Sequence, residues 1–316
     1  MTEPTTALTY VNLYYEAGWK HYQQRSGLSA DQVTDCKRIV DRAYTKALLA
    51  HDWSFLKPKR TIVAVPTQTT TADGVPSTVT VTTDDAFFYA SMVGLADAFA
   101  FTASGNTYTL ASVTSPTVGV MTADASGEAD GDTITFTTSG RSRLPDDFQS
   151  MLSDFFYSDS TGYSRIHRRA GGLVREYRGV SNTTTDRPSM WDIEPVESGV
   201  TGQRWEVVWY PDWSTKTTMI YHSRIWPNAM TADGDYPIGG PGFGAYLEAE
   251  VLARVEFEKG ETAGQARKEA DRLLDIAIRM DRQGRPANLG PMPQSWGNVE
   301  LDSAVPTERG IVTAPS

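Results

Sequence analysis

The stretch RSRLPDDF, Arg141–Phe148, places two adjacent carboxylates behind a proline and follows about eighty residues with the composition of β-structure. Proline is favoured at the first position of a helix, and acidic residues in the first turn are stabilised by the positive end of the helix dipole. Leu144 and Phe148 lie four residues apart, so their side chains can meet and fix the start of a helix. The pattern therefore predicts a short helix with Asp146 and Asp147 in its first turn.

Two adjacent carboxylates also raise the question of catalysis. General acid–base chemistry needs a second ionisable group held in the same pocket, and the neighbouring sequence offers none. We therefore interpret Asp146 and Asp147 as helix starters, not as catalytic residues. The chain also lacks a GxxxxGK[ST] phosphate loop, an HExxH pair and a GxSxG elbow. We predict no catalytic residue, no metal site and no cofactor.

The segment before this stretch, residues 61–140, contains no Lys, Arg or His and eight acidic residues, in a chain of net charge −10. Its alternating Thr, Val, Phe and Tyr residues, broken by Gly and Asp, are typical of strands. The segment predicts a small β-domain inserted into the chain. Without cations it cannot neutralise phosphates, so it would repel nucleic acid. Within it, DASGEADGD (Asp124–Asp132) lacks the glycine and glutamate of a calcium loop and predicts a solvated hairpin tip.

Helical patterns stand at both ends of the chain. Residues 7–24, 29–51, 239–260 and 262–284 carry apolar residues at helical spacing, and Ser29 with Gln32 forms a capping-box pattern. In the first of these helices, Tyr15 and Trp19 belong to the expected apolar stripe. Trp53 is expected to anchor the helices. The single cysteine, Cys36, lies on a helical apolar stripe and suits a reducing compartment.

Together these patterns predict an α+β fold: an antiparallel helical bundle from the N- and C-terminal helices, a β-sheet and hairpin region, and an inserted small all-β domain. Strands are expected over residues 190–196, 204–211 and 216–225, with the last two forming a hairpin. The sequence predicts a discontinuous core of residues 1–60 and 141–284, an inserted domain at residues 61–140, and an extended tail at residues 285–316.

One basic cluster follows RSRLPDDF, and the acidic character of the whole chain argues against a nucleic-acid site there. We predict a protein-facing patch, at a subunit interface, formed by Arg165, Arg168, Arg169, Arg175 and Arg178.

The order of these features resembles the head-to-tail adaptor (connector or neck) proteins of tailed bacteriophages. The stretches that carry the resemblance are Ala43–Pro58, Asn106–Thr117, RLPDDF, Arg204–Ile225, Tyr246–Glu261 and Arg272–Gly290. Its structural motif residues would be Trp53, Leu144, Pro145, Asp147 and Phe148.

The resemblance implies a structural virion protein without enzyme activity, metal or cofactor. Such proteins form a ring, commonly dodecameric, below the portal protein; it joins capsid to tail and extends the DNA channel. The implied partners are the portal, tail or nozzle proteins, other copies of the chain and double-stranded DNA that passes without specific binding. No membrane partner is expected. The location would be the virion neck, after assembly in the host cytoplasm.

The C-terminal segment would then dock on the portal. The candidate docking residues are Arg285, Pro286, Leu289 and Trp296. Two alternatives stay open. The chain could be another virion binding module, a tail or fibre protein whose β-domain recognises a surface, or a hydrolase that uses an unrecognised carboxylate pair.

Overall fold

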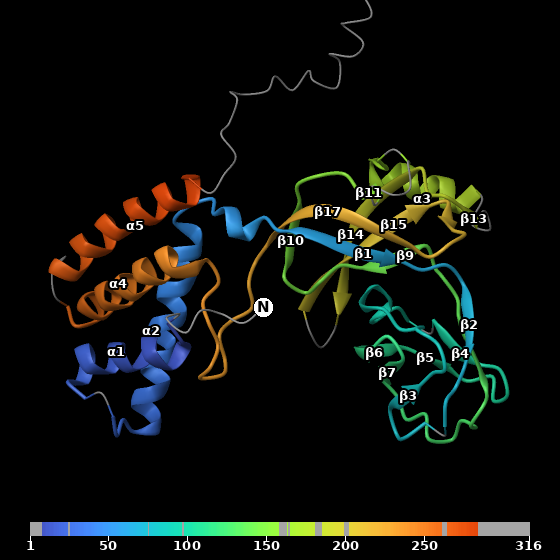
Figure 1. Cartoon of the computed structure of the whole chain (residues 1–316), viewed down its shortest axis with the longest axis horizontal. Coiled ribbons are helices and arrows are strands. Elements are labelled where there is room, and N and C mark those ends of the chain that lie inside the picture. Colours follow the sequence, from blue (N-terminus) through green and yellow to red (C-terminus); the bar gives the residue numbers. More distant parts are fainter. Residues whose placement is uncertain are drawn as a thin grey trace, which may run out of the picture. The chain divides into compact units, whose positions relative to one another are not determined.

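The computed structural model describes residues 8–24, 26–74, 76–96, 98–157, 163, 165–180, 185–198, 202–260 and 264–283. The chain divides into two compact units, each of which is described by itself (Figure 1). The helical unit comprises Met1–Ser54 and Ala229–Ser316, and the β-rich unit comprises Phe55–Asn228. The tail predicted at residues 285–316, with Arg285, Pro286, Leu289 and Trp296, lies outside the described residues.

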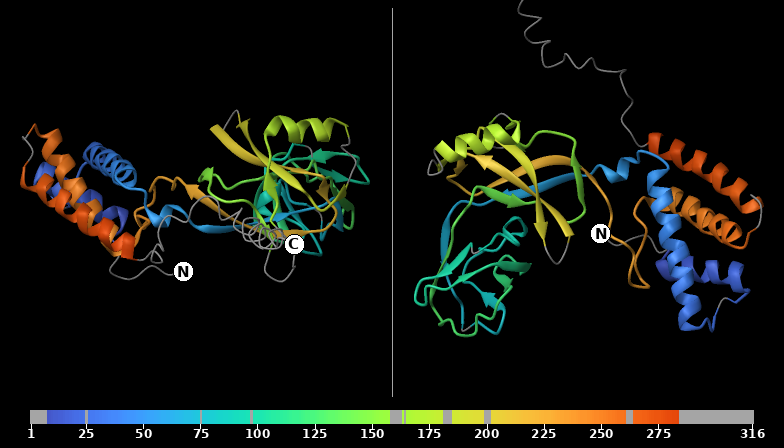
Figure 2. Two further views of the ribbon diagram at one scale, coloured as in Figure 1. Left: turned by 90° about the horizontal axis from the view of Figure 1, so that it is seen from above. Right: turned by 180° about the vertical axis from the view of Figure 1, so that it is seen from behind.

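The helical unit is arranged around one central helix. Its helices are α1 (Tyr10–Tyr22), α2 (Ala30–Leu49), α4 (Gly240–Glu258) and α5 (Gln265–Gln283). Helix α4 packs against the other three and is buried on most of its surface. Figures 1 and 2 show α4 lying between α1 and α5. Since α5 packs only against α4 among the elements with substantial contacts, it forms an outer layer of this unit.

The predicted start of α2 is confirmed. The Ser29 hydroxyl accepts a hydrogen bond from the Gln32 amide at 3.3 Å, and the Gln32 side chain accepts one from the Ser29 amide at 2.9 Å. The stripe predicted for α1 is wrong, because Tyr15 and Trp19 are 37% and 47% exposed. Helix α1 is instead buried through a face that includes Leu13, which packs toward the interior of the unit.

Trp53 is buried in the helical unit, with 1% of its surface exposed. Its indole N–H donates to the Ala47 carbonyl at 2.9 Å, which satisfies its one polar atom. Its ring meets Phe243 edge to face at a centroid distance of 5.2 Å and lies 6.4 Å from Tyr246. Through these contacts Trp53 joins the end of α2 to the start of α4.

The β-rich unit contains several small sheets. One sheet contains β1 and has the strand order β1-β17-β10, with β11 also paired to β17. A second sheet contains β9 and has the order β12-β14-β15-β9. Their bounds are β1 (Lys59–Ala64), β9 (Arg141–Arg143), β10 (Phe148–Met151), β11 (Phe156–Tyr157), β12 (His167–Arg168), β14 (Met190–Ser198), β15 (Gly202–Tyr210) and β17 (Thr217–Ile225). Helix α3 (Gly171–Val180) packs on β14 and β15, and β13 (Thr185–Asp186) pairs with β16 (Asp212–Trp213).

The core between these sheets is aromatic. Phe155 lies at its centre, with ring centroids 4.8 Å from Trp191, 4.7 Å from Trp209 and 5.2 Å from Tyr221. All four side chains are at most 1% exposed. Burial of so much aromatic surface stabilises the arrangement of the two sheets.

The segment inside residues 61–140 has a second core of its own. Its sheets have the orders β2-β8-β4-β5 and β3-β7-β6. Their bounds are β2 (Gln68–Thr71), β3 (Thr80–Thr82), β4 (Phe99–Phe101), β5 (Thr107–Tyr108), β6 (Leu110–Ser115), β7 (Val118–Met121) and β8 (Thr133–Phe136), with a short 3-10 helix, η2, at Ala90–Met92. The buried core between them includes Phe87, Phe88, Phe99 and Phe136.

The predicted fold class is wrong. Within the described residues the chain is a mixed α/β fold with five α-helices and several small sheets, not a helical bundle with a small β insertion. The physical reason is strand pairing between distant segments. Strand β1, which crosses the start of residues 61–140, pairs with β17, and β9, just after these residues, pairs with β15. The chain on both sides of the insertion is thus sheet.

The helix predicted at RSRLPDDF is also wrong. Residues Arg141–Arg143 form β9, Asp146 and Asp147 form a turn, and Phe148–Met151 form β10. Pairing of β9 with β15 and of β10 with β17 satisfies the backbone that a helix would have satisfied locally.

The hairpin predicted between residues 204–211 and 216–225 does not form either. Strand β15 pairs with β14 and β9, whereas β17 pairs with β1, β10 and β11. The short strand β16 lies between β15 and β17 in the chain and pairs with β13 instead.

Candidate functional site

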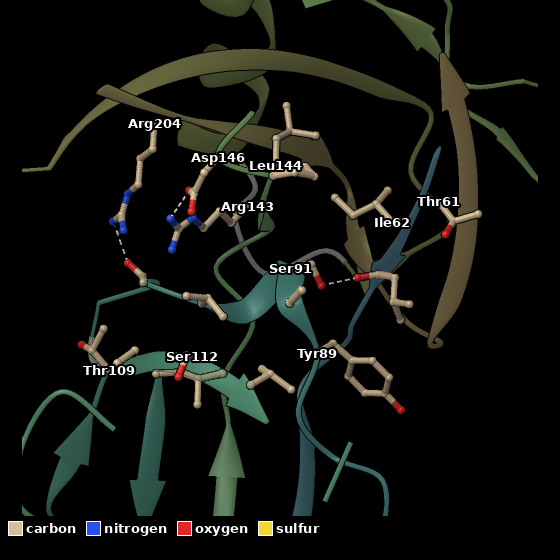
Figure 3. A pocket seen from close by; sticks show the side chains of 18 of the residues that line it. Thr61, Ile62, Tyr89, Ser91, Thr109, Ser112, Arg143, Leu144, Asp146 and Arg204 are labelled. Atoms are coloured by element: carbon tan, nitrogen blue, oxygen red, sulfur yellow. Dashed lines mark hydrogen bonds and ion pairs between the residues drawn. The ribbon is translucent and has the colours of Figure 1, made fainter. Parts of the chain in front are cut away.

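A cavity of about 740 Å³ lies inside the β-rich unit, and Figure 3 shows the side chains around it. Its walls come from β1, the η2 region, β6 and the β9–β10 turn, with Arg204 of β15 and Tyr221 of β17. Strands β1, β6 and β9 each end the strand order of their sheet. We call this space the edge-strand cavity. Strands at such positions offer backbone donors and acceptors to an incoming chain.

Arg204 is the most constrained cation of the edge-strand cavity. Its Nη2 donates to the Gly94 carbonyl at 2.7 Å, and the same nitrogen lies 3.8 Å from the Glu206 carboxylate. Its Nε is buried and has no hydrogen-bond partner within the part of the chain that the structure describes. A buried donor without a partner is costly, so the Nε of Arg204 is held in place at the expense of a hydrogen bond.

Gly94 makes this position of Arg204 possible. Its φ is +73°, a backbone conformation that favours glycine. A Cβ at Gly94 would lie 2.0 Å from Nη1 of Arg204, so any other residue would displace the guanidinium. The Gly94 amide also donates to the Leu110 carbonyl at 2.7 Å, which ties the Arg204 clamp to β6.

A second cation, Arg143 of β9, lines the same cavity and pairs with Asp146. The Arg143 side chain is 14% exposed, whereas that of Asp146 is 71% exposed. Asp147 has a different partner, since its two oxygens accept hydrogen bonds from the two terminal nitrogens of Arg60, one of them at 2.6 Å. Both acids of RSRLPDDF are therefore bound to arginine.

The wall opposite the arginines is held by the η2 region. Ser91 donates its hydroxyl hydrogen bond to the Val63 carbonyl of β1. Tyr89 accepts a hydrogen bond from Lys216 Nζ at 2.8 Å. Figure 3 shows Tyr89 and Ile62 on one side of the cavity and Arg143 and Arg204 on the other. The site therefore combines an apolar and hydroxyl-bearing side with a cationic side.

Beside the cavity, buried carboxylates cover one face of the sheet β12-β14-β15-β9. Glu194 and Glu206 are 6% and 4% exposed and are directly paired in register. Arg141 lies 3.2 Å from Glu194 and 3.3 Å from Glu206. Arg175 hydrogen-bonds Glu194 at 2.6 Å and, with Arg141, holds the pKa of that carboxyl below its usual value against the opposing effect of burial.

The predicted basic patch contributes to this network. Arg168 binds Asp192 at 2.9 Å, Arg175 binds Glu194, and Arg178 binds Asp212 and donates to the Trp209 carbonyl. Arg165 and Arg169 are exposed. Three of the five arginines thus fasten β12 and α3 to carboxylates of their own unit, while a role of the patch at a subunit interface stays a prediction.

The segment DASGEADGD, predicted to be a solvated hairpin tip, contains two buried acidic residues. Glu128 is 3% exposed and accepts hydrogen bonds from Tyr108 at 2.5 Å and Asn106 at 2.8 Å. Asp132 is 8% exposed and accepts one from the Ala103 amide at 3.1 Å. The prediction of a solvated tip is wrong for these two acids, which brace the loops of the insertion.

A second hollow, of about 680 Å³, lies on the helical unit beside α2. Four cations line it, and each has an acidic partner: Lys37 with Asp233, Arg38 with Asp35, and Arg42 and Arg254 with Glu258. The cations of this hollow are therefore partnered by acids, as Arg143 and Arg204 of the edge-strand cavity are by Asp146 and Glu206.

Neither metal-ligand clusters nor membrane-spanning helices are found among the described residues. No group of three or more His, Cys, Asp or Glu side chains there could hold a metal ion. Likewise, none of the helices in this described portion has the length and apolar character needed to cross a bilayer.

Sequence reasoning singled out Leu144 and Pro145, which line the edge-strand cavity, but as residues of a helix start, and it did not identify Gly94 or Arg204. Gly94 and Arg204 are separated by 110 positions, so no spacing pattern connects them. The strand RWEVVWYP gave a weak signal for a charged site. Arg204 and Glu206 are two residues apart in it, so they lie on the same face of the sheet. Comparison with protein-family models and with curated proteins gave no match for this chain.

Proposed function

We propose that this chain is a structural virion protein of a tailed bacteriophage, one subunit of a ring that lies below the portal, joins capsid to tail and extends the DNA channel. The succession of sequence stretches that resembles head-to-tail adaptors supports the proposal. So does the charge of the chain: at net −10, with no cation in residues 61–140, it is suited to let DNA pass without binding it.

The observation that carries the proposal is a pair of apolar surfaces on the outer helices. A closed ring needs two different, complementary surfaces on each subunit. On α1, Tyr15 and Trp19 are exposed at a spacing of four residues, and on α5, Ile276 and Met280 are 38% and 52% exposed at the same spacing. Residues four apart share one face of a helix.

These two surfaces lie on helices separated by α4 (Figure 1). Large apolar side chains gathered on a surface mark sites of protein contact. Stacking the α1 surface of one copy on the α5 surface of the next would bury both and repeat around a ring. The proposed location is the virion neck, with the portal and tail proteins as partners.

The test is an assembly assay with the portal protein of the same virus. We expect negative-stain images to show a second ring stacked on the portal ring. Trp19→Glu or Met280→Glu should abolish that second ring, because a carboxylate would enter an apolar contact. The matched control is Val180→Glu, since Val180 is 84% exposed on α3 of the other unit. Rings that survive both helical variants, or no ring with the unaltered chain, would contradict the proposal.

A further inference from the structure

We propose that helix α3 is a salt-sensitive element of the β-rich unit. It is ordered while its arginines are bound to carboxylates of this unit. When those ion pairs are screened, α3 loses its helical structure locally, before the rest of the unit unfolds. Neither ring formation nor portal docking gives α3 a role, so this property is independent of both.

The sequence of α3 does not favour a stable helix. The helix has 10 residues, GGLVREYRGV, and three of them are glycine. Glycine is among the residues that least favour a helix, and isolated helices shorter than about 12 residues are marginal in water. Its two valines are β-branched, which lowers the helix propensity further. The helical state of α3 therefore depends on its contacts with the rest of the unit.

Apolar packing supplies little of that support. Val174 is the one buried side chain among the residues of α3 whose burial the structure describes. Leu173, Tyr177 and Val180 are exposed, although an amphipathic helix usually turns its apolar residues toward the core. Among the described residues, the aromatic core around Phe155 includes none from α3. This core can therefore persist when α3 is loosened.

Arginines attach α3 to the surface formed by β14 and β15, on which it packs. Arg175 hydrogen-bonds the buried carboxylate of Glu194 at 2.6 Å. Arg178 binds Asp212 and also donates to the Ser139 carbonyl at 2.6 Å. Hydrogen bonds between charged groups are stronger than those between neutral groups. The position of α3 is therefore set largely by charge.

These ion pairs differ in their exposure to dissolved salt. The side chain of Arg175 is 68% exposed, and that of Arg168, which binds Asp192 just before α3, is 56% exposed. Salt ions can reach both pairs and weaken them. The Arg178 side chain is only 19% exposed, and Gly140 leaves room for it, since a Cβ there would lie 2.0 Å from its Nη1. Salt should therefore free the first turn of α3 while Arg178 keeps the other end attached.

Loosening of α3 leaves the sheet beneath it intact. Glu194 keeps Arg141 at 3.2 Å when Arg175 departs, so its carboxylate is not left buried without a partner. Order–disorder transitions of short segments are a common form of conformational switching. Salt would in this way uncover the face of the sheet that carries Asp192 and Glu194.

Hydrogen exchange of the full chain, followed by mass spectrometry of its peptides, tests the proposal. Raising NaCl from about 0.1 M to about 1 M shortens the screening length from about 10 Å to about 3 Å. We expect the amides of Gly171–Val180 to exchange about tenfold faster at the higher concentration, because two exposed ion pairs are weakened together. The amides of β15, in the same unit, should keep their rate. An exchange rate of α3 that does not respond to salt, or that changes only together with β15, would overturn the proposal.

The role of charge is tested with Arg175→Gln. This variant lacks one exposed pair, so at about 0.1 M NaCl its α3 should exchange about threefold faster than that of the parent, and its response to salt should be smaller. The matched control is Glu176→Gln, an exposed neighbour on the same helix, which should leave both the rate and the response unchanged. If Arg175→Gln behaves like the parent, the ion pair does not hold the helix.

The weakness of the helix itself is tested with Gly172→Ala. A Cβ at Gly172 meets nothing within 4 Å, so the substitution raises helix propensity without adding a contact. We expect α3 to exchange about threefold more slowly, with β15 unchanged. Equal changes in α3 and β15, or no change in α3, would contradict the proposal. Ring assembly is observed separately by negative stain, so the two proposals can fail independently.

Discussion

Glu194 and Glu206 face each other directly across β14 and β15, and Arg141 bridges them. Two like charges opposite one another on neighbouring strands are destabilising by themselves. Both carboxylates are buried, so neither can rely on water to disperse its charge. Arg141 lies between the two carboxylates and, with Arg175 on Glu194 and Arg204 near Glu206, offsets their repulsion.

Removal of that bridge should be costly. We expect Arg141→Gln to lower the free energy of unfolding by about 3 kcal/mol, because it leaves two buried carboxylates facing each other. Urea unfolding followed by tryptophan fluorescence measures this. The control is Arg165→Gln, since Arg165 is 51% exposed and 3.9 Å from Asp154; it should cost less than about 1 kcal/mol. Adding Glu206→Gln to the Arg141 variant should recover part of the loss, and no recovery would refute the bridging role.

The same network should make stability depend on pH. Arg175 and Arg141 hold the pKa of Glu194 below its usual value in the folded chain. In the unfolded chain the pKa of this carboxyl is about 4.3, so as the pH falls it is protonated before the carboxyl of the folded chain. The contribution of Glu194 is therefore complete above that pH and is lost as the pH falls through the lower folded pKa. We expect Glu194→Gln to flatten the fall in Tm between about pH 5 and pH 3; an unchanged slope would argue against the effect.

Local signals in the sequence predicted the parts of the fold that local contacts determine. The capping box at Ser29 is such a case, because both of its hydrogen bonds join residues three apart. The strands over residues 190–196, 204–211 and 216–225 were also predicted, because apolar and polar residues alternate within each of these segments.

Pairing partners could not be predicted in this way. RSRLPDDF has the composition of a helix start, yet β9 and β10 pair with strands more than sixty positions away. Helix α3 was missed because arginines on it bind Glu194 and Asp212, which no pattern within residues 171–180 reveals. The edge-strand cavity was missed for the same reason, since its walls meet only after several distant strands have paired.

Gly94 provides a test of the Arg204 clamp. We expect Gly94→Ala to lower the free energy of unfolding by about 2–3 kcal/mol, from the unfavourable φ and from the clash with Arg204. Gly105→Ala is the matched control: its φ is +72° and a Cβ there meets nothing within 4 Å, so it should cost about 1 kcal/mol. Thermal unfolding of both variants gives the comparison, and equal losses would show that Arg204 can move aside freely.

Trp53 should anchor the helical unit. We expect Trp53→Ala to cost about 3–5 kcal/mol, because it leaves a large cavity next to Phe243 and Tyr246. Trp19→Ala serves as the control, since 47% of Trp19 is exposed and its loss should cost far less. Helical circular dichroism during urea unfolding reports on this unit. Similar losses from the two tryptophans would contradict the packing described for α2 and α4.

The two acids of RSRLPDDF should differ in their contribution to stability. Asp147 binds both terminal nitrogens of Arg60, and the side chains of the pair are only 20% and 23% exposed. We therefore expect Asp147→Asn to lower the free energy of unfolding by about 1–2 kcal/mol. Asp146 is 71% exposed, so Asp146→Asn should change it by less than about 0.5 kcal/mol. If the two acids instead began a helix, both substitutions would cost a similar small amount, and chemical denaturation distinguishes the two outcomes.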